Sequence, residues 1–134
     1  MKTVEEWFAE HKDKMSKDEL LDKKLSDWVG KSAYSVYPTG YSWEIYTESL
    51  DACFEDLIPK LKSIGFMARV QYSPLRDNDT GKLISDWTGY ASCYDVSGNR
   101  GLNHFEEWGK APTPALALCL AIEKVIDNYK ETTK

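Results

Sequence analysis

The chain has 134 residues, of which 42% are hydrophobic, and this size predicts one domain with a hydrophobic core rather than a disordered segment. Its formal net charge of −5 and its lack of a Lys/Arg cluster argue against a nucleic-acid backbone as the main partner. Three cysteines without metal-ligand spacing predict buried thiols in a reducing compartment. With no apolar leader and no apolar run of roughly 20 residues, we expect a cytoplasmic protein without a membrane partner.

Residues 1–31 are rich in charge and predict two short helices that form a hairpin. Thr3-x-x-Glu6 and Ser16-x-x-Glu19 both fit the capping box, in which two side chains satisfy each other's backbone N–H groups. Apolar residues follow each box at helical spacing, and Gly30 is expected to end the second helix. The hairpin therefore has one apolar side, which we expect to be appended to the rest of the chain or packed on its core.

Residues 32–134 predict an α/β sandwich domain that opens with an aromatic-rich stretch. Pro38-Thr39-Gly40 predicts a turn between two short extended pieces. A helix then starts at Thr47 or Ser49 and ends at Gly65, and Pro59 is expected to kink it or to leave one carbonyl in need of another donor.

From Phe66 onward the hydrophobic period changes from helical to two. The alternation predicts strands over residues 66–73, 84–96 and 102–108, with turns at 77–82 and 97–101. Thr113 and Pro114 then begin a helix that is apolar on every side, so it must be covered from more than one direction. The fold class is α+β: a three-stranded antiparallel meander sandwiched or covered by two main helices, in the order α-β-β-β-α, with an N-terminal helical hairpin.

Three stretches of the chain resemble the phage ABA-sandwich domain, a family of small phage- or prophage-encoded α/β proteins. They are Trp43 through Gly65, Trp87-Thr-Gly-Tyr-Ala91, and Pro112-Thr-Pro-Ala-Leu-Ala-Leu-Cys-Leu-Ala121. The resemblance covers roughly residues 20–130. It implies a phage origin and a helix/sheet/helix sandwich, and it brings no catalytic residues.

No constellation in the chain predicts a reaction. Asp77-x-Asp79-x-Gly81 lacks the Gly and Glu that a calcium loop needs at its later positions, and is interpreted as a hairpin turn. His104 has Glu106 on the same strand face, but no second histidine lies near enough in sequence to complete a metal site. No nucleophile elbow and no Gly-rich phosphate loop occur. We therefore expect no enzyme activity, no cofactor and no metal.

Arginine and aromatic residues gather in the strand region. All three arginines of the chain fall there, whereas the helices use only lysine. Guanidinium groups suit phosphates and stack on aromatic rings. If Val70 and Ala91 face the helices, then Arg69, Tyr90 and Tyr94 share the opposite face of the sheet. The predicted ligand-binding residues are Arg69, Tyr90, Tyr94, Arg100 and Trp108, the last two contributed from neighbouring loops or a second subunit.

Two classes of function remain open. The first is a non-enzymatic, phage-encoded binding protein, best interpreted by analogy as a counter-defence sponge that sequesters a nucleotide-derived immune signal in an infected bacterial host. The alternative is a protein-binding inhibitor or accessory factor that docks on a host or phage protein, which the acidic N-terminal hairpin favours. A homo-dimer or higher homo-oligomer is expected, because the last helix and the hairpin together carry more apolar surface than a three-stranded sheet covers.

Overall fold

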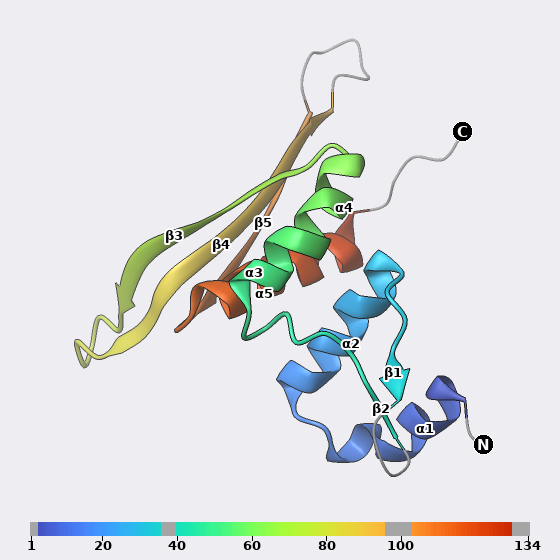
Figure 1. Ribbon diagram of the computed structural model, residues 1–134. Coiled ribbons are helices and arrows are strands. Elements are labelled where there is room, and N and C mark those ends of the chain that lie inside the picture. Colours follow the sequence, from blue (N-terminus) through green and yellow to red (C-terminus); the bar gives the residue numbers. More distant parts are fainter. Residues whose placement is uncertain (1–2, 36–39, 96–102, 130–134) are drawn as a thin grey trace.

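The computed structural model describes residues 3–35, 40–95 and 103–129, and its elements are labelled in Figure 1. The chain begins with α1 (Val4–His11), a 3-10 turn η1 (Lys12–Lys14) and α2 (Lys17–Val29). Both predicted capping boxes are confirmed: the Thr3 and Ser16 side chains accept hydrogen bonds from the backbone N–H groups three residues later. The predicted end of the second helix is also confirmed, because Gly30 takes the left-handed conformation with φ of 77°.

A short two-stranded sheet and a broken helix follow. Strands β1 (Tyr34–Ser35) and β2 (Tyr41–Ser42) pair antiparallel, as expected for two extended pieces on either side of a turn. The Pro38-Thr39 part of that predicted turn lies outside the described residues. The helix comprises α3 (Leu50–Ala52), a π-helical turn η2 (Cys53–Leu57) and α4 (Ile58–Ser63).

The π-helical turn shows how the chain accommodates Pro59 inside this helix. In an α-helix, the ring of Pro59 would clash with the carbonyl of Glu55 and leave it without a donor. The structure instead widens the preceding turn, and the N–H of Ile58 donates to the carbonyl of Cys53 five residues back. The helix therefore changes type just before the proline, a local arrangement that neither expectation for Pro59 specified.

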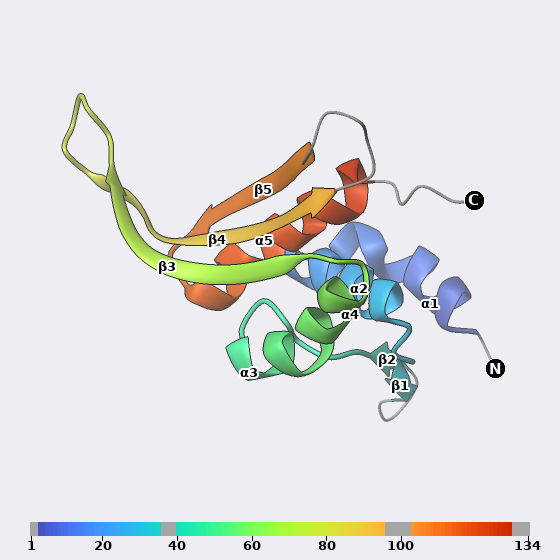
Figure 2. The same cartoon turned by 90° about the horizontal axis from the view of Figure 1, so that it is seen from above.

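The main sheet is the predicted three-stranded antiparallel meander. Its strands β3 (Met67–Arg76), β4 (Leu83–Asp95) and β5 (Asn103–Ala111) lie in the order β3-β4-β5. The register of β3 on β4 shifts between Tyr72 and Leu75, where a β-bulge or irregularity interrupts the pairing. Figure 2 shows β3 and β4 bending away from the helices towards their connecting turn.

The last helix, α5 (Pro114–Asn128), is capped by Thr113 and lies along the sheet. As predicted, it is covered from more than one direction, but the cover comes from its own chain, whereas a second copy was expected to supply part of it. Ala117 lies against Gly89 and Gly109 of the sheet, whereas the Cys119 Sγ lies 3.6 Å from the Cys53 Sγ of η2. Helix α2 adds Leu21 and Leu25 to the same core. The apolar surface of α5 therefore does not itself require a second copy of the chain.

The described helices lie on one face of the main sheet, and no described helix covers the other face (Figures 1 and 2). The structure shows an α+β fold with two antiparallel sheets. It does not confirm the helix/sheet/helix layering that the family resemblance implies, because α3–α4 and α5 share one side of the sheet. Within the described residues, no helix has the length and apolar character needed to cross a bilayer.

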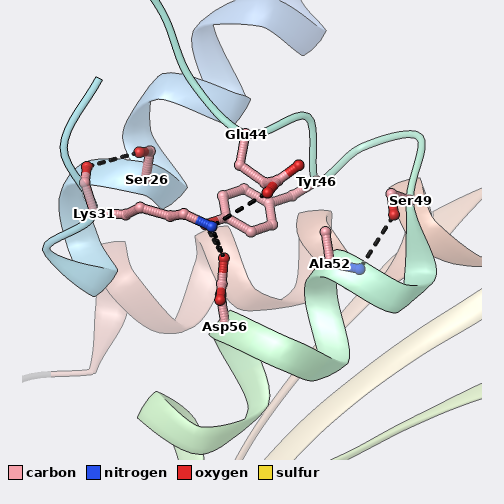
Figure 3. Close-up of polar contacts among 7 residues, drawn as sticks. All are labelled: Ser26, Lys31, Glu44, Tyr46, Ser49, Ala52 and Asp56. Atoms are coloured by element: carbon pink, nitrogen blue, oxygen red, sulfur yellow. Dashed lines mark hydrogen bonds and ion pairs between the residues drawn. The ribbon is translucent and has the colours of Figure 1, made fainter. Parts of the chain in front are cut away.

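A polar network joins the end of α2 to the π-helical turn, as Figure 3 shows. Lys31 Nζ lies 2.9 Å from Asp56 Oδ2 and 3.2 Å from Glu44 Oε1, and the hydroxyl of buried Tyr46 donates to Asp56 at 2.8 Å. Hydrogen bonding from Lys31 lowers the pKa of Asp56, while burial raises the pKa of Tyr46. The network therefore fixes an ionised carboxylate beside a neutral phenol, and it fastens the N-terminal helices to the core.

Candidate functional site: the open face of the sheet

The side of the main sheet that faces away from the helices is formed by alternate residues of the three strands. A Cβ added at Gly89 or Gly109 would point towards α5. Side chains alternate along a strand, so the residues next to these glycines on β4 and β5 face away from the helix. Cross-strand pairing places the matching residues of β3 in the same rows. We call this surface the open face and define it by its central residues: Met67, Arg69, Gln71, Thr88, Tyr90, Ser92, Glu106, Trp108 and Lys110.

The middle row of the open face is a continuous series of side-chain contacts across all three strands, which we call the stack. Tyr90 pairs with Arg69 on one side and with Trp108 on the other. The Arg69 guanidinium lies 4.6 Å from the centre of the Tyr90 ring, a cation–π distance. The Tyr90 and Trp108 rings meet edge to face, with their centres 4.4 Å apart and an interplanar angle of 62°. The sheet thereby holds one guanidinium group and two aromatic rings next to one another.

Neighbouring polar groups orient the Tyr90 ring and hold the backbone at Trp108. The Tyr90 hydroxyl donates a hydrogen bond of 2.7 Å to Glu106 Oε2, which orients the phenol ring. From the helix side, Lys124 Nζ donates to the backbone carbonyl of Trp108 at 2.6 Å. The Trp108 side of the stack remains open to solvent, since this residue is 39% exposed. An exposed indole next to a guanidinium offers a stacking surface together with a positive charge.

A hollow of about 500 Å³ lies beside the stack. Its walls are formed by Gln71, Ser73, Pro74, Leu75, Thr88, Trp108 and Lys110. Three of these residues, Ser73 to Leu75, belong to the part of β3 where the register on β4 shifts. The lining offers the amide of Gln71, the hydroxyl of Thr88 and the ammonium of Lys110. The space is large enough for a small organic molecule.

The structure brings together three of the five residues predicted to bind a ligand: Arg69, Tyr90 and Trp108. Tyr94 lies further along β4, opposite His104. Arg100 lies outside the described residues. Lys110 was not among the predicted residues, because the third strand was expected to end near Trp108, whereas β5 continues to Ala111. Continued alternation beyond Trp108 is the sequence signal for Lys110.

The cysteines lie apart from this face. Cys53, Cys93 and Cys119 are buried free thiols, as the sequence predicted. Hydrogen bonding with Cys53 and burial both raise the pKa of Cys119, which disfavours the reactive thiolate. In the part of the chain that the structure describes, no group of His, Cys, Asp and Glu side chains is arranged to hold a metal ion.

A second hollow, of about 530 Å³, lies near the N-terminus between α1, α2 and the stretch that follows β2. The aromatic part of its wall is formed by Trp7, Tyr41 and Trp43. Its charged lining is acidic, comprising Asp18, Glu19, Asp22 and Glu48. This hollow differs from the open face in the sign of its charge, so the two surfaces suit different partners.

The chemistry of these two surfaces is the basis for assigning a function. Comparisons with models of known protein families, with curated proteins and with solved structures find no match to this chain.

Proposed function

We propose that this chain is a non-enzymatic binding protein whose open face holds a small phosphorylated ligand with an aromatic ring system. The observation that carries this proposal is the stack of Arg69, Tyr90 and Trp108 across three strands, next to a hollow of about 500 Å³. The stack supplies a planar cation and an exposed ring from a rigid support. A nucleotide-like compound needs these two features together.

Each part of the ligand has a matching group on this face. The Arg69 fork suits a phosphate because it donates two parallel hydrogen bonds. The exposed indole of Trp108 suits a base, and stacking of one base contributes about 1–3 kcal/mol. Lys110 adds a second positive charge in the hollow, and Thr88 and Gln71 add neutral hydrogen-bonding groups. Retention of such a ligand requires no nucleophile and no general base.

The biological setting that we propose follows from the sequence resemblance and from analogy with small phage proteins. In this setting the chain is a phage-encoded member of the ABA-sandwich family that acts in the cytoplasm of an infected bacterium. It would work as a homo-oligomer, as a counter-defence sponge that sequesters a nucleotide-derived immune signal without cleaving it. The exposed contact surface of Arg69, Tyr90 and Trp108 suits storage of a ligand rather than its conversion.

Isothermal titration calorimetry tests the proposal with a panel of cyclic dinucleotides, cyclic trinucleotides and cyclic ADP-ribose isomers. We expect at least one compound to bind and to be recovered unchanged after the protein is heated. Arg69→Ala should weaken that binding about 10- to 100-fold, because one charge-assisted bidentate contact is lost. Arg76→Ala is the matched control, since the Arg76 guanidinium donates to the Gly81 carbonyl within the hairpin turn. No binding across the panel, or release of a hydrolysed product, refutes the proposal.

Docking on another protein is the second candidate function, and the N-terminal hollow favours it. Trp7, Tyr41 and Trp43 provide an aromatic wall, and exposed Ile45 also belongs to the lining. Its acidic rim suits a basic segment of a partner protein. A pull-down from host lysate with the wild type and with Ile45→Glu tests this candidate. A partner that is captured equally by both proteins would not be docking at this hollow.

A further inference from the structure

The charges on β5 are arranged symmetrically about Trp108. Glu106 precedes Trp108 by two residues and Lys110 follows it by two, so each lies about 7 Å away along the strand. All three residues belong to the open face, and all three are exposed. A carboxylate and an ammonium at equal distances on either side of a ring form a self-complementary pattern.

We infer that a second copy of the chain packs its open face on this one, with an anionic ligand held between the two copies. The inference rests on the proposed function, because the same face binds the ligand in both. The two-fold axis runs parallel to the row of Arg69, Tyr90 and Trp108, midway between the two sheets. Rotation about this axis exchanges the positions before and after Trp108, so Glu106 of each copy meets Lys110 of the other.

The dimensions of sheet packing allow these contacts. Two sheets that pack face to face lie about 10 Å apart, a gap that a glutamate and a lysine span together. Trp108 of one copy then lies opposite Trp108 of the other, so the ring of a nucleotide ligand would lie between the two indoles. Two exposed apolar side chains of this face, Met67 at 53% and Trp108 at 39% exposure, are withdrawn from water by the packing.

Charge favours a second copy as the occupant of this face. The chain as a whole carries −5, so two copies repel each other through most of their surfaces. The nine residues that define the open face include two cations, Arg69 and Lys110, and one anion, Glu106, while Asp86 continues the same side of β4 beyond Thr88. Two such faces attract at the Glu106–Lys110 contacts and retain a positive charge in the middle of the interface.

The positive charge that remains in the middle of the interface determines where the anionic ligand binds. The two-fold axis brings the Arg69 guanidinium groups of both copies to the same end of the row. Like charges at this separation repel, unless an anion lies between them and accepts hydrogen bonds from both. A phosphoryl group meets this need, so each copy contributes one arginine to a shared anion site. Because coupling between sites is reciprocal, binding of the anion strengthens dimerisation, and dimerisation strengthens binding.

Sedimentation equilibrium of the full chain tests this inference, with inorganic pyrophosphate as the probe anion. The wild type should form a dimer that pyrophosphate strengthens. Glu106→Lys alone and Lys110→Glu alone should each weaken dimerisation about 100-fold or more, because each change places like charges opposite each other twice. The double variant Glu106→Lys/Lys110→Glu should restore the dimer, since the pair is re-formed with its signs exchanged. Lys62→Glu on α4 is the control for a change of net charge alone.

The outcomes separate this inference from the proposed function. A monomeric wild type, a dimer that pyrophosphate leaves unchanged, or a double variant that stays monomeric overturns the shared site. A monomer that binds a nucleotide of the panel in a one-to-one complex also overturns it, while the proposed function stands. The full pattern of loss and restoration, with no nucleotide bound in calorimetry, supports the shared anion site and refutes the nucleotide-binding function. Circular dichroism of each variant verifies that the fold is retained.

Discussion

Gly89 of β4 lies so close to Ala117 of α5 that a side chain does not fit between them. A Cβ atom on Gly89 would be 2.3 Å from the Ala117 carbonyl oxygen and 2.6 Å from the Leu118 Cα. Gly109 of β5 approaches the same carbonyl equally closely. These two glycines on neighbouring strands form the surface against which α5 packs. Their close packing also determines which strand residues face away from the helix and form the open face.

Gly89→Ala should destabilise the fold by about 3 kcal/mol, because the methyl group meets backbone atoms that cannot rotate away. Urea unfolding followed by circular dichroism measures the change. Gly81→Ala is the control: nothing lies within 4 Å of its added Cβ, and its φ of +70° predicts a smaller loss of about 1 kcal/mol. Equal losses for the two variants would show that α5 does not depend on close contact with the sheet.

Asp22→Asn should not lower stability at neutral pH. The Asp22 carboxylate is buried and accepts hydrogen bonds from the backbone N–H and the hydroxyl of Thr47, at 2.8 and 3.1 Å. Burial raises its pKa, and the Thr47 hydrogen bonds oppose this only in part. Stability therefore decreases as the pH rises from the unfolded-state pKa through the higher folded-state pKa. Asparagine retains both hydrogen bonds if the Thr47 hydroxyl reverses, and it removes this pH dependence.

Asp22→Ala provides the contrast to this variant. It leaves the Thr47 N–H without its partner and should cost about 1–3 kcal/mol. Urea unfolding of the wild type and both variants over a range of pH distinguishes the two effects. A large loss of stability in Asp22→Asn at neutral pH would mean that the negative charge itself is needed.

The Lys31–Asp56 pair should contribute stability that acid removes. Hydrogen bonding from Lys31, with a further hydrogen bond from Tyr46, lowers the pKa of Asp56 below that of the unfolded chain. The contribution is present above the unfolded-state pKa and is lost as the pH falls through the folded-state pKa. Because Lys31 is 45% exposed, solvent screens the pair, and we expect Asp56→Asn to cost only about 1 kcal/mol at neutral pH.

The wild type and Asp56→Asn should therefore approach each other in stability as the pH falls below about 4. Asp51→Asn, an exposed change at the start of the same helix, is the control. A difference between wild type and Asp56→Asn that is constant with pH would assign the effect to packing rather than to the ion pair.

The native protein should resist thiol reagents. Cys53, Cys93 and Cys119 are all buried, and the raised pKa of Cys119 further lowers its thiolate population. Labelling with Ellman's reagent should therefore be slow in buffer and should become fast in denaturing urea. Rapid modification of one thiol under native conditions would contradict the burial of the core between η2 and α5.

The local elements could be predicted from the sequence because their signals lie within a few residues. The capping boxes at Thr3 and Ser16, the end at Gly30 and the start at Thr113 each depend on side chains that bond to nearby backbone. The widened turn before Pro59 could not be predicted, because proline is equally compatible with a kink and with a π-helical turn.

The arrangement of the layers depends on contacts between distant residues. Alternation in the strands correctly placed Arg69 and Tyr90 on one face, but it does not state what covers that face. Gly89 and Gly109 let α5 pack closely on one side of the sheet. A glycine in a strand signals close approach of another backbone. That signal could have been read at both positions, and it would have indicated the side on which the last helix packs.

The most direct test of the open face as the functional surface is a two-dimensional NMR titration of the isotope-labelled protein with the tightest-binding nucleotide of the panel. The amide signals of Arg69, Tyr90 and Trp108, and the indole N–H of Trp108, should shift most. Signals around Trp7 and Trp43 in the N-terminal hollow should stay unchanged. Shifts that cluster instead at the N-terminal hollow, with those of the open face unaffected, would contradict the assignment of function to this sheet.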